Sequence, residues 1–207
     1  MISLLKVRDQ VVRITDLEEC GAGYRFDIRY ARKDNFFGRK VYPEPKAFLL
    51  SHVEEDLHRA HRDLARHGYG LLIFDGYRPW SVSKLFWDHS NEHDRGFLAD
   101  PAKGSSHNRG CAVDLSLFDL HTGKPVEMPS DFDEMNEKAH ASYDGGTLES
   151  RRLRNLLREA MENNGFNGIS VEWWHFNHQT HHDWPVMNFS FEEIAQAPKS
   201  RLQPRAE

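Results

Sequence analysis

The chain has 207 residues, of which 39% are hydrophobic and 12% aromatic, so it can bury one sizeable core, and we expect a single domain over residues 1–207. Its formal net charge is −5, with lysines and arginines scattered along the chain, which argues against nucleic acid as a partner. Lys6 and Arg8 interrupt the apolar N-terminus and no run is long enough to span a membrane, so we predict a cytoplasmic protein without a membrane partner. Cys20 and Cys111 lack Cys-x-x-Cys spacing, which argues against a disulfide framework and a thiolate zinc site.

The first part of the chain alternates strand-like and helix-like segments, which favours a mixed α+β domain. Residues 24–30 alternate in character like a half-buried strand. Over residues 45–67 apolar side chains recur at helical spacing, and Gly68 fits a C-terminal stop. The apolar residues at this spacing are Leu49, Val53, Leu57, Ala60 and Leu64. Residues 70–74 form a short apolar run before an Asp-Gly turn, so we predict a buried strand there and a helix after Pro79.

The second part of the chain continues the same alternation. Residues 111–117 read as a strand, and residues 153–161 carry apolar side chains on one face of a helix that ends near Gly165. Residues 169–174 return as a strand, and we expect residues 198–207 to form a frayed tail.

One acidic side chain lies in the middle of an otherwise buried strand. Alone, Asp114 could simply pair with an arginine or lie on a sheet edge. His107 lies seven residues upstream, behind a turn where Gly110 suits a positive φ or a close backbone approach, and this turn lets the imidazole and the carboxylate converge on one ion. Catalytic zinc takes three protein ligands and keeps a fourth position for water, so His107, Asp114 and His175 form a candidate ligand set.

The segment Glu172-Trp173-Trp174-His175 supplies a candidate base next to the last ligand. Residues three apart face opposite sides of a flat strand, so we expect the strand to bend or end near His175. Zinc lowers the pKa of bound water to about 7, and a carboxylate beside it can take the proton and later pass it to a leaving amine. Alternatively, Glu172 could be an ordinary surface residue.

Arg78 precedes a proline, which holds the arginine in extended backbone at the end of the buried strand 70–74. Its guanidinium could form a buried salt bridge to Asp75. Alternatively, Arg78 could stabilise the oxyanion of a tetrahedral intermediate, an effect worth on the order of 10²–10³ in rate for one donor.

Other histidines must be weighed, because the chain has 13 of them. His89-Ser90-Asn91-Glu92-His93 fits the inverted zincin pattern His-x-x-Glu-His, but Gly96 ends the segment early and we discount it. The histidines that we assign to solvated faces or loops are His58, His61, His178, His181 and His182.

Taken in order along the chain, these motifs resemble those of the zinc-dependent D-alanyl-D-alanine dipeptidases, the group that includes the vancomycin-resistance dipeptidases. This group lies within the zinc D,D-peptidases that share a fold with the Hedgehog signalling domain. The resemblance runs nearly end to end. Besides Ser-x-His-x₆-Asp and Glu-x-x-His it rests on Asp27-Ile28-Arg29-Tyr30-Ala31, Asn35-Phe36-Phe37-Gly38, Asp75-Gly76-Tyr77-Arg78-Pro79 and Phe132-Asp133.

The resemblance implies an α+β fold with a mostly antiparallel central sheet flanked by helices, and one Zn²⁺ per chain. The residue roles that it implies are zinc binding by His107, Asp114 and His175, general acid and base catalysis by Glu172, transition-state stabilisation by Arg78, and binding of the dipeptide's ammonium group by Ser105 and Asp133. The segment 87–104 is shorter than in the vancomycin-resistance members, which leaves cleft access and substrate length open.

The function that we predict is zinc-dependent hydrolysis of the dipeptide D-Ala-D-Ala to two D-alanines, in cell-wall metabolism. One alternative is a zinc carboxypeptidase acting on peptidoglycan stem peptides, which would accept blocked or longer substrates. Another is a non-catalytic zinc-binding module. The presence of Glu172 and Arg78 argues against that module, because structural zinc requires neither residue.

Overall fold

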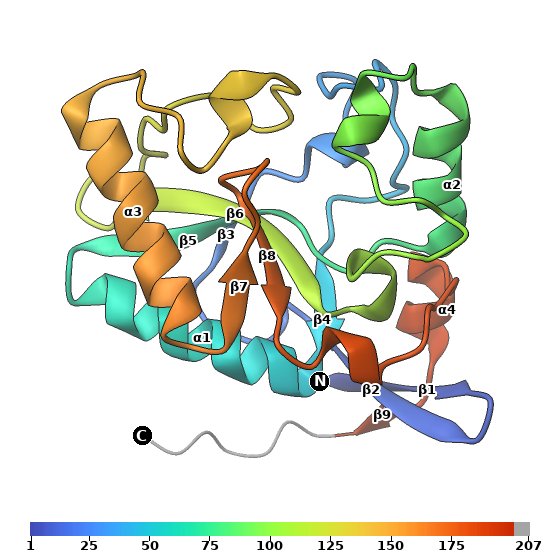
Figure 1. The fold of residues 1–207 in the computed structure, drawn as a ribbon. Coiled ribbons are helices and arrows are strands. Elements are labelled where there is room, and N and C mark those ends of the chain that lie inside the picture. The colour runs from blue at the N-terminus through green and yellow to red at the C-terminus, as the bar shows by residue number, and fades with distance from the viewer. Residues whose placement is uncertain (201–207) are drawn as a thin grey trace.

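The computed structural model describes residues 1–200, which form two β-sheets with α-helices around them (Figure 1). The first sheet is antiparallel, in the order β4-β2-β1-β9. Its strands are β1 (Ile2–Val7), β2 (Gln10–Asp16), β4 (Phe48–Leu50) and β9 (Lys199–Ser200). The second sheet has the order β3-β5-β6-β8-β7, and only its β3–β5 pair is parallel. Its strands are β3 (Arg25–Phe26), β5 (Tyr69–Asp75), β6 (Ala112–Asp119), β8 (His175–His178) and β7 (Phe166–Gly168).

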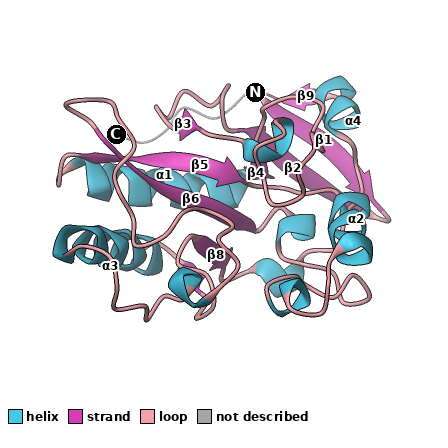
Figure 2. Ribbon diagram, turned by 90° about the horizontal axis from the view of Figure 1, so that it is seen from above, coloured by secondary structure: helices cyan, strands magenta, loops and turns pink. Residues whose placement is uncertain are grey.

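Helices flank the sheets, as Figures 1 and 2 show. They are α1 (Ser51–Ala65), α2 (Trp80–His89), α3 (Leu148–Glu162) and α4 (Phe191–Gln196). Helices α1 and α3 contact each other, and both contact the five-stranded sheet. Together with the mostly antiparallel pairing, this arrangement confirms the predicted α+β class.

The alternation of side chains along the strands separates a packing face from a polar face of the five-stranded sheet. On β6, Val113 and Leu115 are fully buried, whereas Asp114 points the opposite way. On β8, His178 hydrogen-bonds to Asp56 of α1, and His175 therefore faces away from that helix. The face opposite α1 is thus the one that can carry a polar site.

Several predicted elements are confirmed with shifted ends. A helix occupies residues 51–65 and stops before Gly68, whose φ is +85°, but Leu49 belongs to β4 rather than to the helix. The buried strand at 70–74, the helix after Pro79, the strand at 111–117 and the helix that ends before Gly165 are all present.

Of two further predicted strands, the one at 24–30 is much shorter than predicted and the one at 169–174 is wrong. Over residues 24–30 only Arg25 and Phe26 pair with β5, because the chain then turns into a 3₁₀ helix at Arg29–Ala31. Residues 169–174 form a loop, and the strand begins at His175 instead of ending there.

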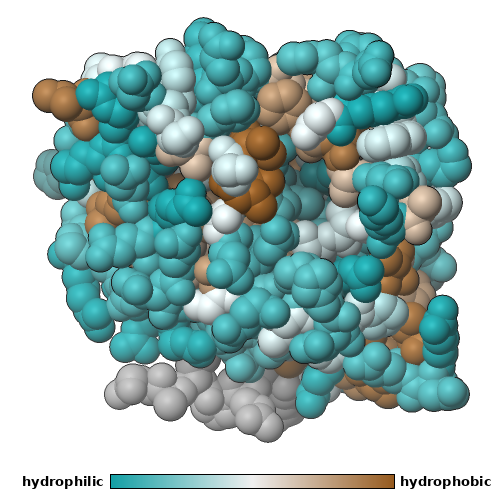
Figure 3. Space-filling model, in the orientation of Figure 1, coloured by the Kyte–Doolittle hydropathy of each residue, from teal (hydrophilic) through white to brown (hydrophobic). Residues whose placement is uncertain are grey.

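The predicted frayed tail is also corrected in part. Lys199 and Ser200 form β9, which pairs with Ser3 and Ile2 of β1. Residues 201–207 lie outside the described part of the chain. Within the described part, no helix is both long and apolar enough to cross a bilayer. One face of the molecule is mainly hydrophilic, with an apolar patch near a hollow in its middle (Figure 3).

Candidate metal centre

Three acidic and imidazole side chains form a row across the polar face of the five-stranded sheet. Asp75 of β5 lies opposite Asp114 of β6, and Asp114 lies opposite His175 of β8. A register shift between Ile73 and Asp75 brings Asp75 opposite Asp114. Opposite residues in adjacent strands have Cβ atoms about 4.5–5.5 Å apart, so the sheet itself brings these side chains together.

His107 reaches the same place from a 3₁₀ turn before β6. The turn, His107–Arg109, ends at Gly110, whose φ is +66°. A Cβ at Gly110 would also lie 3.3 Å from the backbone nitrogen of Leu50, so both structural reasons expected for this glycine are confirmed. The ring of His107 is fixed because its Nδ1 bonds to the carbonyl oxygen of Gly76 at 2.7 Å.

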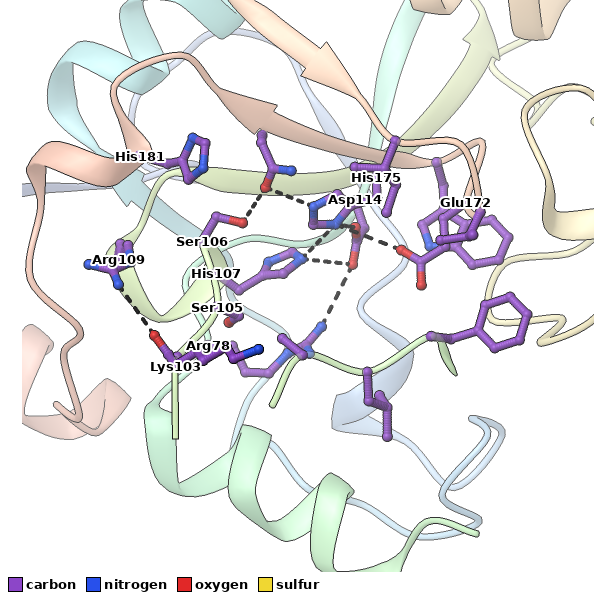
Figure 4. Close-up of a pocket in the computed structure, with 18 of the residues that line it drawn as sticks. Arg78, Lys103, Ser105, Ser106, His107, Arg109, Asp114, Glu172, His175 and His181 are labelled. Carbon is purple, nitrogen blue, oxygen red and sulfur yellow. Dashed lines mark hydrogen bonds and ion pairs between the residues drawn. The ribbon is translucent and has the colours of Figure 1, made fainter. Parts of the chain in front are cut away.

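The donor atoms of His107, Asp114 and His175 converge on one point (Figure 4). Nε2 of His107 lies 3.1 Å from Nδ1 of His175, and the two nitrogens lie 3.3 Å and 2.9 Å from the oxygens of Asp114. Ligand atoms around a tetrahedral zinc lie about 3.3 Å apart, given metal–ligand distances of roughly 2.0–2.1 Å. The spacing therefore fits one small cation.

The hydrogen bonds of the two imidazoles support the same interpretation. Nδ1 of His107 donates to the carbonyl oxygen of Gly76, and Nε2 of His175 donates to Oδ1 of Asn177 at 2.9 Å. With one ring proton of each imidazole in these bonds, the other nitrogen of each ring and the carboxylate of Asp114 would be able to bind a cation. This donor set suits a metal ion, and all three residues are buried.

Glu172 lies beside this cluster, in the loop before β8. Its Oε2 is 3.9 Å from Nδ1 of His175, and its side chain is 12% exposed. Because residue 172 is in a loop and not in a flat strand, two residues three positions apart can face the same cavity. Burial raises the pKa of the Glu172 carboxyl to about 7, with a further contribution from the charge of Asp114.

Arg78 forms the buried salt bridge that the sequence suggested and also lines the cavity. Its Nε and Nη2 bind Oδ2 of Asp75 at 2.9 Å and 2.8 Å, so the buried salt bridge exists. The same guanidinium lines the cavity, and its Nη2 lies 3.7 Å from Asp114. The ring of Tyr30 lies 5.3 Å from its Cζ. Asp75 therefore holds the guanidinium group of Arg78 at the edge of the cluster.

Asp133 forms another part of the cavity wall. Its φ is +60°, in the left-handed region that non-glycine residues rarely adopt. Tyr30 donates a hydrogen bond to its Oδ2 at 2.9 Å. Removal from water raises the pKa of Asp133 well above its usual range, and the charges of Asp114 and Glu172 add to this. A cation that enters the cavity would offset these effects and favour the ionised form of this side chain.

The opposite side of the cavity is basic. Lys103, Ser105 and Arg109 lie on the side of the cluster away from Glu172 (Figure 4). Arg109 donates hydrogen bonds to the carbonyl oxygens of Trp184 and Lys103, and within residues 1–200 it forms no ion pair with a carboxylate. Ser105 accepts a hydrogen bond from the backbone of Asn108 at 3.2 Å, which leaves its hydroxyl proton available.

The cavity that contains these groups has a volume of about 480 Å³. Apolar side chains form part of its lining, and they include Phe97, Leu98, Met135, Ile169 and Val171. The predicted site residues His107, Asp114, His175, Glu172, Arg78, Ser105 and Asp133 all line this one cavity. Their catalytic and binding roles stay predictions.

Sequence reasoning missed some residues that shape the site. Asn177, which bonds to His175, lies two residues later in the same strand and therefore on the same face. This spacing could have indicated it. Lys103 and Arg109 carried no comparable signal, because scattered basic residues are common on surfaces.

The remaining histidines differ in part from expectation. His178 and His61 are buried at 1% and 8% exposure, so their assignment to solvated faces or loops was wrong. Helix α2 ends at His89 and the chain continues as a loop, so the pattern at 89–93 places no two ligands on one helical face. Within residues 1–200, the only group of three or more possible ligands that converges is the one described above.

Known proteins include relatives that match most of this chain. A family model described as D-Ala-D-Ala dipeptidase matches residues 10–194. The chain is 36% identical over 186 residues to a D-alanyl-D-alanine dipeptidase of Enterococcus faecium, a match that covers 80% of this chain and 91% of the relative. It is 32% identical over 178 residues to a D-alanyl-D-alanine dipeptidase of Escherichia coli (strain K12), covering 86% of this chain and 91% of the relative.

Solved structures include a similar chain, the vancomycin-resistance D,D-dipeptidase VanXYg in complex with a D-Ala-D-Ala phosphinate analogue. The sequence identity is 20% and the TM-score 0.44, and the match covers 95% of this chain and 76% of the other.

Proposed function

Because this chain belongs to the D-Ala-D-Ala dipeptidase family, we propose that it is a zinc metallopeptidase that hydrolyses D-alanyl-D-alanine to two D-alanines. The observation that carries the proposal is that the three converging ligand atoms, Glu172 and Asp133 all line a single cavity. A site for structural zinc would need neither a free carboxylate beside the ligands nor an open cavity.

His107, Asp114 and His175 would hold one Zn²⁺, since their donor atoms have suitable spacing and the outer nitrogen of each ring has a hydrogen-bond partner. When bound, zinc supplies Lewis acidity, which polarises the scissile carbonyl and acidifies water. Glu172 takes the proton from the attacking water at its carboxylate. It then passes this proton to the nitrogen of the leaving D-alanine, so one side chain acts as base and acid in turn.

Arg78 is the proposed stabiliser of the oxyanion. The ion pair to Asp75 uses its Nε and Nη2 and holds the guanidinium plane at the edge of the ligand cluster. A donor that is fixed before the reaction starts costs no reorganisation when charge develops on the carbonyl oxygen. The salt bridge and the catalytic role are therefore compatible, because Asp75 orients the group that acts.

The two ends of the cavity suit the two ends of a zwitterionic dipeptide. Asp133 provides a carboxylate for the ammonium group, close to Glu172. Lys103 and Arg109 at the other end provide cations for the carboxylate group. A small zwitterion offers little apolar surface, so these ionic contacts would orient it and exclude longer chains.

Ser105 keeps its predicted contact with the ammonium group as one of two possibilities. It lies beside Lys103 and Arg109 (Figure 4), and its hydroxyl proton could instead go to the substrate carboxylate. Replacement of Ser105 with Ala distinguishes the two. Loss of an ammonium contact would reduce the penalty for N-acetylation, whereas loss of a carboxylate contact would reduce the penalty for C-terminal amidation.

The test of the proposed function measures release of D-alanine from D-Ala-D-Ala, from its N-acetylated form and from its C-terminal amide. Zinc-loaded protein is compared with chelator-treated protein and with protein to which zinc has been returned. Turnover of the free dipeptide alone, lost with chelator and regained with zinc, supports a dipeptidase. Cleavage of the acetylated form supports the carboxypeptidase alternative. Bound zinc without turnover of any of these substrates favours the non-catalytic module.

The cytoplasmic location and the part in cell-wall metabolism belong to the same proposal. D-Ala-D-Ala is a cell-wall building block, and a protein that hydrolyses it where it is made would limit its supply. Cell fractionation with an antibody against the chain tests the location.

A further inference from the structure

The loop of residues 131–133 carries Asp133 into the cavity while its first residue stays at the surface. The side chain of Asp131 is 66% exposed. Phe132 is buried at 4% exposure, and its ring stacks on Phe74 with centroids 4.5 Å apart. Asp133 lines the cavity. The three side chains therefore point to solvent, core and cavity in turn.

The backbone of this loop is strained where the cavity begins. Asp133 has a φ of +60°, where the Cβ of a non-glycine residue crowds its own backbone. Such a conformation persists only where the surrounding contacts hold it, and it is common at functional sites. The contacts that hold Asp133 are therefore part of what places its carboxylate.

Two consecutive residues of the 3₁₀ helix Arg29–Ala31 make these contacts. Arg29 donates two parallel hydrogen bonds to the carboxylate of Asp131, from Nη1 and Nη2, each at 2.8 Å. The hydroxyl of Tyr30 donates to Asp133 at 2.9 Å. The 3₁₀ helix Arg29–Ala31 thus binds the residues on both sides of Phe132.

Arg29 is itself held in place. Its Nε donates to Oδ2 of Asp27 at 3.2 Å, and its side chain is 22% exposed. Its Cζ lies 5.8 Å from the ring of Phe74 and 6.0 Å from that of Phe132. A guanidinium with these neighbours is preorganised for bidentate binding and differs from a freely moving surface arginine.

We propose that the Arg29–Asp131 ion pair is a positioning clamp, which fixes the 131–133 loop so that Asp133 meets the ammonium group of the dipeptide. Arg29 and Asp131 do not touch the substrate, and they act through Asp133. The inference rests on the proposed function in one respect, the identity of the group that Asp133 binds. The competing explanation is that Phe132 anchors the loop alone and the ion pair is an ordinary surface contact.

The kinetic test compares Arg29→Gln and Asp131→Asn with Arg32→Gln. Arg32 is a matched control because it lies in the same segment and forms ion pairs with Asp27 at 2.6 Å and Asp34 at 2.9 Å, but not with the 131–133 loop. Loss of the clamp should raise the KM for D-Ala-D-Ala by at least about 3-fold and change kcat by less than about 2-fold. Arg29→Lys should recover part of the loss, since it keeps the charge but not the bidentate geometry.

Hydrogen exchange provides a readout that needs no turnover. The amides of Phe132 and Asp133 should exchange faster in Arg29→Gln than in the native chain, and at the native rate in Arg32→Gln. In Asp131→Asn only the Asp133 amide is compared, because the amide of Phe132 donates directly to Oδ1 of Asp131 at 2.9 Å. Asp131 is exposed, so Asp131→Asn tests the clamp even if Arg29→Gln folds poorly.

The outcomes separate the two proposals. Unchanged exchange in the clamp variants overturns the clamp. Faster exchange with unchanged KM overturns its part in substrate binding. Absence of D-Ala-D-Ala turnover by the native enzyme overturns the proposed function instead, and the exchange experiment still decides whether the loop is clamped.

Discussion

Glu172 is the residue whose replacement separates catalysis from metal binding. It lies 3.9 Å from Nδ1 of His175 but is not one of the three converging ligands. Glu172→Gln should therefore lower kcat by about 10²–10⁴, the range for loss of a general base, while bound zinc stays at one per chain. Steady-state kinetics and metal analysis of the same preparation measure both quantities.

A matched control for this variant is Glu159→Gln, which changes an exposed glutamate of α3 in the same chemical way. It should leave turnover and metal content unchanged. Native turnover in Glu172→Gln would remove Glu172 from its assigned role.

Asp133 is the residue that should set selectivity for the free amine. A hydrogen bond to a charged group contributes about 1.5–3 kcal/mol, so Asp133→Asn should raise the KM for D-Ala-D-Ala by roughly 10- to 100-fold. The penalty for N-acetylation should shrink in parallel, because the variant no longer distinguishes a charged amine from an amide. The ratio of kcat/KM for the two substrates measures this, with Asp144→Asn, an exposed change outside the cavity lining, as the control. An unaltered ratio would exclude Asp133 from the ammonium site.

At the scale of elements, the contact between α1 and β5 contains a buried histidine that makes the fold sensitive to acid. Nδ1 of His61 accepts a hydrogen bond from the backbone of Leu71 at 3.2 Å, and its ring packs edge-on to Tyr24. Burial lowers the pKa of His61 to about 4, with the charge of His58 adding to the effect. The native structure therefore favours the neutral ring.

The sign of the effect follows from this lowered pKa. The stabilisation is complete above the unfolded pKa of about 6.5 and is lost as the pH falls from there through 4, at about 1.4 kcal/mol per pH unit. His61→Gln keeps an acceptor but cannot titrate, so its free energy of unfolding should fall less than that of the native chain between pH 6.5 and 4. Urea unfolding at several pH values measures the difference, with exposed His67→Gln as the control. Parallel curves for native chain and His61→Gln would contradict the assignment.

The elements that could be predicted are those with a complete local signal. The helix at 51–65 has apolar periodicity and a terminal glycine, and β5 is an apolar run before a turn. In residues 24–30 and 169–174 apolar and polar side chains alternate as they do in strands. Such a pattern indicates only which side chains are buried. Whether such a segment pairs depends on a neighbouring strand, and that neighbour is set by the whole fold.

The site could be predicted to a similar depth. His107, Asp114 and His175 were indicated by residue type and spacing, and the structure brings them together. Asn177, the carbonyl of Gly76 and the ion pair between Arg29 and Asp131 were not predicted. For Asn177, the two-residue spacing from His175 in one strand was an available signal. For the other two contacts the residue types are common and the partner is distant in sequence or is a backbone atom, so the sequence carries no local signal of the contact.

At the scale of the whole molecule, the candidate metal centre lies where two paired strands and the turn before one of them meet. Its candidate ligands come from β6, from β8 and from the turn that precedes β6. Arg78, which lies beside the cluster, comes from the link between β5 and α2. These segments come together only in the folded state, so a cation that binds to all of them should stabilise that state.

Removal of the metal should lower the melting temperature. A ligand present at about 1,000 times its dissociation constant stabilises the folded state by about 4 kcal/mol. For a chain of this length each kcal/mol corresponds to roughly 2–4 °C, so chelation should lower Tm by about 10 °C and returned zinc should restore it. Calorimetry with and without chelator, paired with metal analysis, measures the shift.

Two variants identify the site that is responsible. Asp114→Ala should abolish the zinc-dependent shift, because it removes the carboxylate that lies between the two imidazoles. Joint replacement of His181 and His182 with Ala should preserve it, although these rings also line the cavity and could bind zinc adventitiously. If the shift disappeared with His181 and His182 and persisted without Asp114, the stabilising ion would bind at His181 and His182, and the proposed set of His107, Asp114 and His175 would be excluded as its ligands.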